Sequence, residues 1–107
     1  MKYMMFVCTD TEPETDESQV PDIEVWVAEN DAAGRRLQGS ILASPAAATT
    51  VRVRGGELLV SDGPFAETKE LIVGFDILEC ADLDEAIEVA RTHPMSWNGR
   101  IELRPFA

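Results

Sequence analysis

Two stretches of the sequence are apolar at consecutive positions instead of at every second position. The first is Lys2 to Thr9, and the second is Leu71 to Cys80, which is interrupted by acidic residues at Asp76 and Glu79. A strand with one face in water alternates apolar and polar residues, whereas a strand covered on both faces does not. Both stretches are therefore expected to be central strands of a sheet, with a pocket or a partner chain covering one side.

A helical period follows the first strand. From about Pro21 to Ala33, one face of a helix would carry Ile23, Trp26, Val27 and Asn30. Proline is tolerated in a first turn, and the glycine at position 34 is typical of the residue that follows a helix. The basic pair at positions 35 and 36 suits the carbonyl end of this helix and needs no ligand.

A second amphipathic helix is expected from Leu83 to Thr92. Asp82 would be its N-cap residue, with an acid three positions later in a capping-box pattern. Its apolar face would carry Leu83, Ala86, Ile87 and Ala90. Pro94 would stop this helix, and a turn at positions 98 and 99 would lead into a last strand, Arg100 to Arg104.

Between the helices the pattern changes to alternation. Leu37 to Leu42 resembles a short strand, and in Thr49 to Arg54 valines alternate with arginines, as in a half-buried strand whose arginines face solvent. The glycines at positions 55 and 56 form a hairpin turn into a strand from Glu57 to Ser61. The segment from Asp10 to Pro21 holds several acids and two prolines, and it is expected to be an exposed loop.

This order of elements predicts an α+β fold of the ferredoxin-like type, strand-helix-strand twice with a hairpin inserted, in one domain spanning residues 1–107. Two helices can cover only one face of the sheet. The other face would stay bare in a monomer, which conflicts with the two-sided apolar pattern of the central strands.

Composition excludes several classes of partner. The formal net charge is −11, from 20 acidic and 9 basic residues, which argues against nucleic acid and against an anionic membrane surface. The apolar runs are too short for a signal peptide or a membrane span, so a cytoplasmic location is expected. Cys8 and Cys80 are expected to be reduced thiols, and the sequence groups no metal ligands and contains no cofactor fingerprint.

The stretch around Asp62-Gly63-Pro64-Phe65 is the most distinctive motif. Glycine and proline together end regular structure, and an aspartate before such a turn commonly accepts hydrogen bonds from backbone N–H groups. Asp62 is therefore a turn aspartate on this pattern alone.

The same residues carry a resemblance to a known family. Further parts of the sequence join the motif in order: Thr50 to Gly56, Glu67 to Glu70, Gly74-Phe75, Asp82 to Ala86, His93-Pro94 and Ile101 to Pro105. The series is similar to the DGPF branch of the YCII-related proteins. The resemblance implies a dimeric α+β barrel in which two sheets pair, and hence a homodimer. It also implies a site that combines a carboxylate and a histidine in a cleft, without a cofactor.

On that resemblance Asp62 and His93 are the candidate catalytic residues. Phe65, as an apolar wall beside Asp62, and Asp76 and Arg104, as charged groups on the strands, are candidate ligand-binding residues from the sequence itself. His93 has alternatively the position of a cation that caps the carbonyl end of the second helix. Other branches of the family carry a histidine on the first helix, and this chain has none there, so their acid–base chemistry does not transfer.

Asp76 is unusual because a buried carboxylate must be paired or have a raised pKa. We expect it to pair with an arginine, for which Arg52 and Arg104 are candidates. The alternative is that it points into a pocket and acts as a base.

Three functions fit these residues. The first is a protein that binds a small molecule in a cleft of the barrel. The second is a cofactor-independent lyase or isomerase, a class that the resemblance suggests through a dehalogenating relative. The third is a regulatory module, because genes of the DGPF branch tend to lie near those of extracytoplasmic-function sigma factors.

Overall fold

The computed structural model describes residues 1–63 and 71–107. Its strands are β1 (Lys2–Cys8), β2 (Arg36–Ile41), β3 (Thr49–Arg54), β4 (Glu57–Asp62), β5 (Ile72–Glu79) and β6 (Arg100–Pro105). Its α-helices are α1 (Ile23–Ala32), α2 (Leu83–Arg91) and α3 (Met95–Asn98), and two short 3₁₀ turns are η1 (Glu17–Gln19) and η2 (Pro45–Ala47). The expected strands and both expected helices are present to within two residues of their predicted ends.

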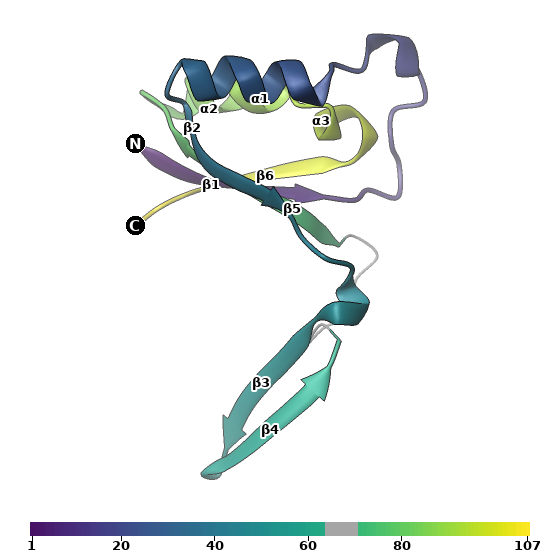
Figure 1. Ribbon diagram of the computed structural model, residues 1–107, viewed down its shortest axis with the longest axis vertical. Helices are drawn as coiled ribbons and strands as arrows, with labels where there is room; N and C mark the ends of the chain where they lie inside the picture. The colour runs from purple at the N-terminus through teal and green to yellow at the C-terminus, as the bar shows by residue number, and fades with distance from the viewer. Residues whose placement is uncertain (64–70) are drawn as a thin grey trace.

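The main sheet has the strand order β2-β5-β1-β6, and every neighbouring pair is antiparallel. The fold is α+β, and this order is compatible with the predicted ferredoxin-like arrangement. Strands β3 and β4 form a separate two-stranded sheet. Figure 1 shows α1 and α2 side by side on one face of the main sheet, and the β3–β4 hairpin leading away from its end.

Local signals set the helix ends. The Asp22 carboxylate caps α1 by accepting hydrogen bonds from the backbone N–H groups of Glu24 and Val25. Past the other end, Gly34 has φ +70°, a backbone conformation that glycine adopts readily. The expected cap of α2 is confirmed, because Asp82 accepts a hydrogen bond from the Glu85 N–H at 2.9 Å.

The sequence pattern does not predict the short helix α3, because Pro94 marks there only the end of the second helix. Pro94 is the N-cap residue of α3, with φ −58°. Proline lacks the N–H that a helix leaves unpaired at its start, so one proline can end α2 and begin the next helix.

The core lies between the helices and one face of the sheet. It comprises Tyr3, Met5, Val7, Trp26, Leu78, Cys80, Ala86, Val89 and Ala90. Tyr3, Met5 and Val7 alternate along β1, and Leu78 lies opposite Tyr3 in β5, so the same face of both strands enters the core. Cys8 and Cys80 are both free thiols.

The opposite face of the sheet is also apolar, as the sequence predicted. Met4 lies opposite Ile77 and Phe6 lies opposite Phe75 in the β1–β5 register, and all four are only partly buried. Within residues 1–63 and 71–107 no helix covers this face (Figure 1). We call these four residues the open face.

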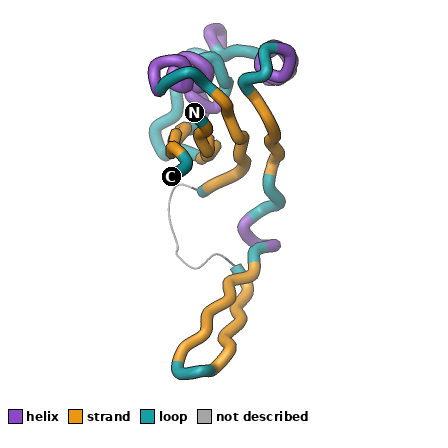
Figure 2. The backbone as a smooth tube through the Cα atoms, turned by 90° about the vertical axis from the view of Figure 1, so that its left-hand side faces the viewer, coloured by secondary structure: helices purple, strands orange, loops and turns teal. Residues whose placement is uncertain are grey.

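The expectation of a half-buried β3 is wrong for the single chain. Val51 and Val53 are 61% and 57% exposed, and Leu58 and Val60, which face them across the hairpin, are exposed to a similar degree. These side chains are exposed because the hairpin extends away from the helix-covered sheet (Figure 2). Among the described residues, no helix is long and apolar enough to cross a membrane.

Candidate functional site

A cleft of about 560 Å³ opens between α1, the α2–α3 junction and the β2 side of the sheet. Its walls are mainly apolar, and they include Val7, Ile23, Val27, Ile41, Val73, Phe75, Pro94 and Met95. Its polar side chains include Arg36, Asp76 and His93. A few polar groups within an apolar wall are the usual composition of a small-molecule site.

Asp76 is buried at the floor of the cleft and is paired with an arginine. The Arg36 Nε donates a hydrogen bond to Asp76 Oδ1 at 2.7 Å, across neighbouring strands β2 and β5. The cross-strand neighbour of Asp76 is Gly39. A Cβ atom at Gly39 would lie 2.0 Å from Asp76 Oδ1, so the carboxylate occupies the space that a side chain would fill.

The Arg36–Asp76 pair confirms that Asp76 is paired, with a partner other than those predicted. Burial raises the pKa of the Asp76 carboxyl, and the hydrogen bond from Arg36 opposes this rise. Arg36 also contacts Asp31, through Nη1 at 3.0 Å from Oδ1. One guanidinium thus lies between two carboxylates, and the described residues form no hydrogen bond to the second oxygen of Asp76.

Trp26 anchors α1 beside the cleft. Its indole Nε1–H donates to the carbonyl oxygen of Val89 in α2 at 2.8 Å. Asn30 Nδ2 donates to the Trp26 carbonyl oxygen, and Asn30 Oδ1 accepts from Arg35 Nε, both at 2.8 Å. These bonds satisfy the buried polar groups of α1 and hold the indole in one orientation.

The His93 ring packs against that indole in a T-shaped arrangement. The two ring centroids are 4.6 Å apart and the planes are inclined by 75°. His93 Nδ1 accepts a hydrogen bond from the Met95 N–H at 3.0 Å. Burial, with a smaller contribution from the positive charge of Arg36, lowers the pKa of His93 from 6.5 to about 4.

The alternative of His93 as a cationic cap of α2 is therefore wrong. Its side chain accepts a hydrogen bond at the start of α3, and its lowered pKa keeps the ring neutral near pH 7. A neutral imidazole with Nδ1 accepting carries its proton on Nε2.

Of the five predicted site residues, Asp76 and His93 line the same cleft. Asp62 ends β4 in the projecting hairpin, and the described residues of a single chain do not form the expected Asp62–His93 pair. Arg104 lies on the opposite face of the sheet, with its guanidinium carbon 5.3 Å from the centre of the Phe6 ring. Phe65 lies outside the described residues.

Two residues of the cleft floor, Arg36 and Gly39, are not among the predicted site residues. The sequence pattern places Arg36 with its neighbour at the end of the first helix, but that helix ends earlier and Arg36 begins β2. The signal for Gly39 was present, because a glycine inside a short strand often marks the close approach of another group.

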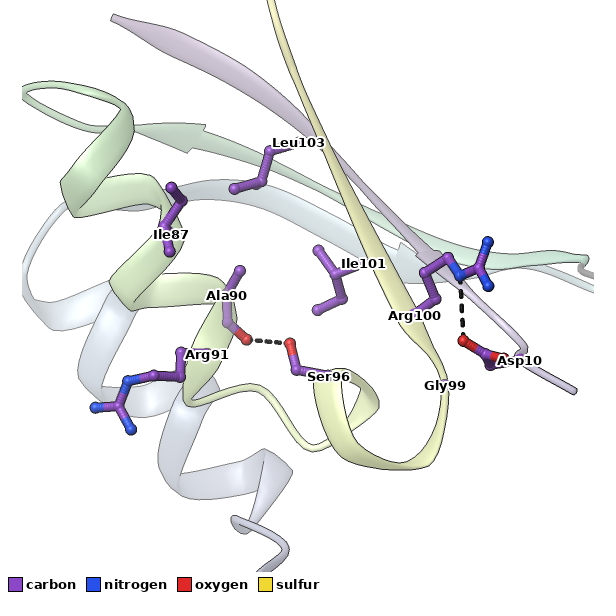
Figure 3. A pocket seen from close by; sticks show the side chains of 9 residues that line it. All are labelled: Asp10, Ile87, Ala90, Arg91, Ser96, Gly99, Arg100, Ile101 and Leu103. Atoms are coloured by element: carbon purple, nitrogen blue, oxygen red, sulfur yellow. Dashed lines mark hydrogen bonds and ion pairs between the residues drawn. The ribbon is translucent and has the colours of Figure 1, made fainter. Parts of the chain in front are cut away.

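A second groove of about 470 Å³ lies between α2, α3 and β6 (Figure 3). Its floor includes Ile87, Ile101 and Leu103. Its charged groups are already engaged, since Arg100 Nε is 3.1 Å from Asp10 Oδ2 and Arg91 pairs with Glu88. None of the predicted site residues lines it. No group of His, Cys, Asp and Glu in the described parts of the chain could hold a metal ion.

Comparison with known proteins agrees with the resemblance of the sequence. The family model of the YCII-related domain matches residues 1–106. An uncharacterised protein of Rhizobium meliloti (strain 1021), R00369, is 40% identical over 96 residues, which cover 88% of this chain and 77% of that protein. The chain belongs to the YCII-related domain family.

Proposed function

We propose that the protein binds a small organic molecule in the cleft lined by Trp26, Asp76 and His93. The observation that supports this most directly is the cleft itself, because its volume and its apolar walls suit a ligand of that size. The Arg36–Asp76 pair and the His93 ring would orient the ligand. Both groups are positioned by other contacts before any ligand arrives, which lowers the entropic penalty of binding.

The test is a screen of metabolites by thermal shift, followed by NMR mapping. The chain has two tryptophans, and only Trp26 lines the cleft, while the Trp97 indole donates to the Arg91 carbonyl oxygen. A cleft ligand should shift the indole N–H signal of Trp26 and leave that of Trp97 in place. Hits that move neither signal, or both equally, would contradict the proposal.

A second candidate function is a cofactor-independent lyase or isomerase. Support comes from the presence in one cleft of a carboxylate with a raised pKa and a neutral imidazole, which suit proton transfer. Asp76 would take the acid–base role that was assigned to Asp62 on the resemblance. Turnover of a screened ligand, lost in Asp76→Asn, would favour the enzyme; binding without turnover would favour a binding or regulatory module.

We also propose that the protein is a homodimer in which the open faces of two sheets pack as an α+β barrel. The apolar open face supports this, as does the solvent-accessible surface of 7325 Å². A compact monomer of 11.8 kDa would expose roughly 5,900 Å². The difference of roughly 1,400 Å² exceeds the roughly 800 Å² that a standard interface buries on each partner, and it is in the range of large, obligate interfaces.

A further inference from the structure

We infer that the cleft selects an uncharged, largely apolar ligand that presents a hydrogen-bond acceptor, such as a carbonyl oxygen, to His93 and a donor, such as a hydroxyl, to Asp76. This inference rests on the proposed small-molecule function and narrows it to a chemical class. Three features of the cleft carry it: the direction of the His93 proton, the unused oxygen of Asp76 and the charge around Arg36.

The first feature is the tautomer of His93. The Met95 N–H occupies Nδ1, so the proton of the neutral ring is on Nε2. Among the described residues no acceptor is bonded to Nε2, and the ring lines the cleft. His93 can therefore donate a hydrogen bond to a ligand but cannot accept one. A ligand that displaces solvent from the cleft must offer an acceptor to this N–H if the group is to stay satisfied.

The second feature is the carboxylate of Asp76. One oxygen, Oδ1, accepts from Arg36, and the described residues offer no donor to the other. This oxygen is open to the cleft, and a ligand that displaces solvent there must replace the lost donor. A ligand hydroxyl or N–H group in the cleft would supply it.

The third feature is net charge. Arg36 is the only cation among the described residues that line the cleft, and it contacts both Asp31 and Asp76. Two carboxylates around one guanidinium leave a net negative charge. An anionic ligand would meet this charge without a free cation to compensate, so a neutral ligand is favoured over its carboxylate analogue.

The experiment compares four probes of similar shape by NMR titration of the full chain. Meta-hydroxyacetophenone offers both a carbonyl and a hydroxyl, and meta-hydroxybenzoate replaces the carbonyl group by an anion. Meta-ethylphenol lacks the acceptor, and acetophenone lacks the donor. We expect the first probe to shift the Trp26 indole signal and to bind at least about tenfold more tightly than each of the others.

The variant that isolates His93 is His93→Asn. Asparagine can still accept the Met95 N–H, but it is too short to place a donor where Nε2 stands. The preference for meta-hydroxyacetophenone over meta-ethylphenol should disappear in this variant, with little change in the affinity for meta-ethylphenol. Proton–nitrogen NMR spectra of the wild-type imidazole provide a readout that needs no ligand, because His93 is the only histidine.

Several outcomes would overturn the inference. A proton on Nδ1 instead of Nε2 would remove its basis. Equal or tighter binding of meta-hydroxybenzoate at the Trp26 signal would refute the charge argument while leaving the proposed small-molecule function intact. If no probe shifts that signal, the ligand class is wrong, and the metabolite screen alone decides the proposed function.

Discussion

The Arg36–Asp76 pair joins residues 40 positions apart in the sequence and holds the floor of the cleft. We predict that Asp76→Asn lowers the free energy of unfolding by about 1–3 kcal/mol near neutral pH, because the amide is a weaker partner for a largely buried guanidinium than the carboxylate is. Removal of a desolvated charge, the cause of the raised pKa of Asp76, opposes this loss and keeps it small. Arg36 keeps Asp31, which limits the loss. Urea denaturation of the two proteins measures the difference.

The control for this substitution is Glu88→Gln, which removes one charge of the exposed Arg91–Glu88 pair. Solvent screens that pair, so its loss should have a much smaller effect. A more stable Asp76→Asn protein would refute the structural role of the pair. It would instead identify Asp76 as a carboxylate held at a stability cost for function.

The buried His93 ring makes stability depend on pH. Its pKa is about 4 in the folded chain, against about 6.5 when unfolded. Between these values the unfolded chain binds a proton that the folded chain does not. We predict that stability falls as the pH is lowered from about 6.5 to about 4, by up to roughly 3 kcal/mol from this group, with no contribution at higher pH.

Other charged groups around the cleft complicate the pH profile. Arg36 stays charged, and the raised pKa of Asp76 acts in the opposite direction, since protonation of Asp76 on acidification favours the folded state. The comparison of wild type with His93→Asn across this pH window isolates the histidine. Equal pH slopes in the two proteins, or a wild-type His93 that titrates near its ordinary pKa by NMR, would contradict the prediction.

The sequence identified Asp76 and His93 as unusual, but it could not identify their partners. A charged residue in an apolar strand is visible from local pattern alone. The pairing with Arg36 depends on the register between β2 and β5, and that register includes a shift between Arg36 and Gln38. The sequence also could not predict the distance between Asp62 and His93, because that distance depends on the direction in which the hairpin leaves the main sheet.

The edge strand β2 can lie beside the Asp76 carboxylate because residue 39 is a glycine and has no side chain. We predict that Gly39→Ala lowers the free energy of unfolding by about 1–3 kcal/mol, because the new methyl group would overlap Asp76 Oδ1 and push the carboxylate away from Arg36. The neighbouring Ser40→Ala is the matched control, with an expected change below about 0.5 kcal/mol. Similar unfolding midpoints for both variants would show that the cleft floor adapts freely.

Strands and helices could be predicted here because periodicity and capping are local. Leu83–Arg91 follows directly from an N-cap aspartate and an apolar stripe. The burial of β3 could not be predicted, because alternation shows which residues share a face but not whether anything covers it. An isolated two-stranded hairpin is only marginally stable, so we expect the exposed valines of β3 to be covered in the proposed dimer.

The shape of the whole chain bears on its oligomeric state. Its radius of gyration is 16.0 Å, whereas a compact domain of this length would have about 13 Å. The projecting hairpin accounts for this extension (Figure 2). The hairpin and the open face are both apolar surfaces that a second copy of the chain would cover in the proposed dimer.

We predict a stable dimer in sedimentation experiments at micromolar concentration, with twice the 11.8 kDa mass of the chain. Phe6→Glu should convert it to a monomer. The new carboxylate would lie on the open face beside Glu102, which is the cross-strand neighbour of Phe6, and pairing two such faces would bury like charges. Ile87→Glu, on the half-exposed surface of α2, is the matched control and should leave the dimer intact. A wild-type protein that sediments as a folded monomer would refute the barrel, and a dimer that survives Phe6→Glu would place the interface elsewhere, with the hairpin as the next surface to test.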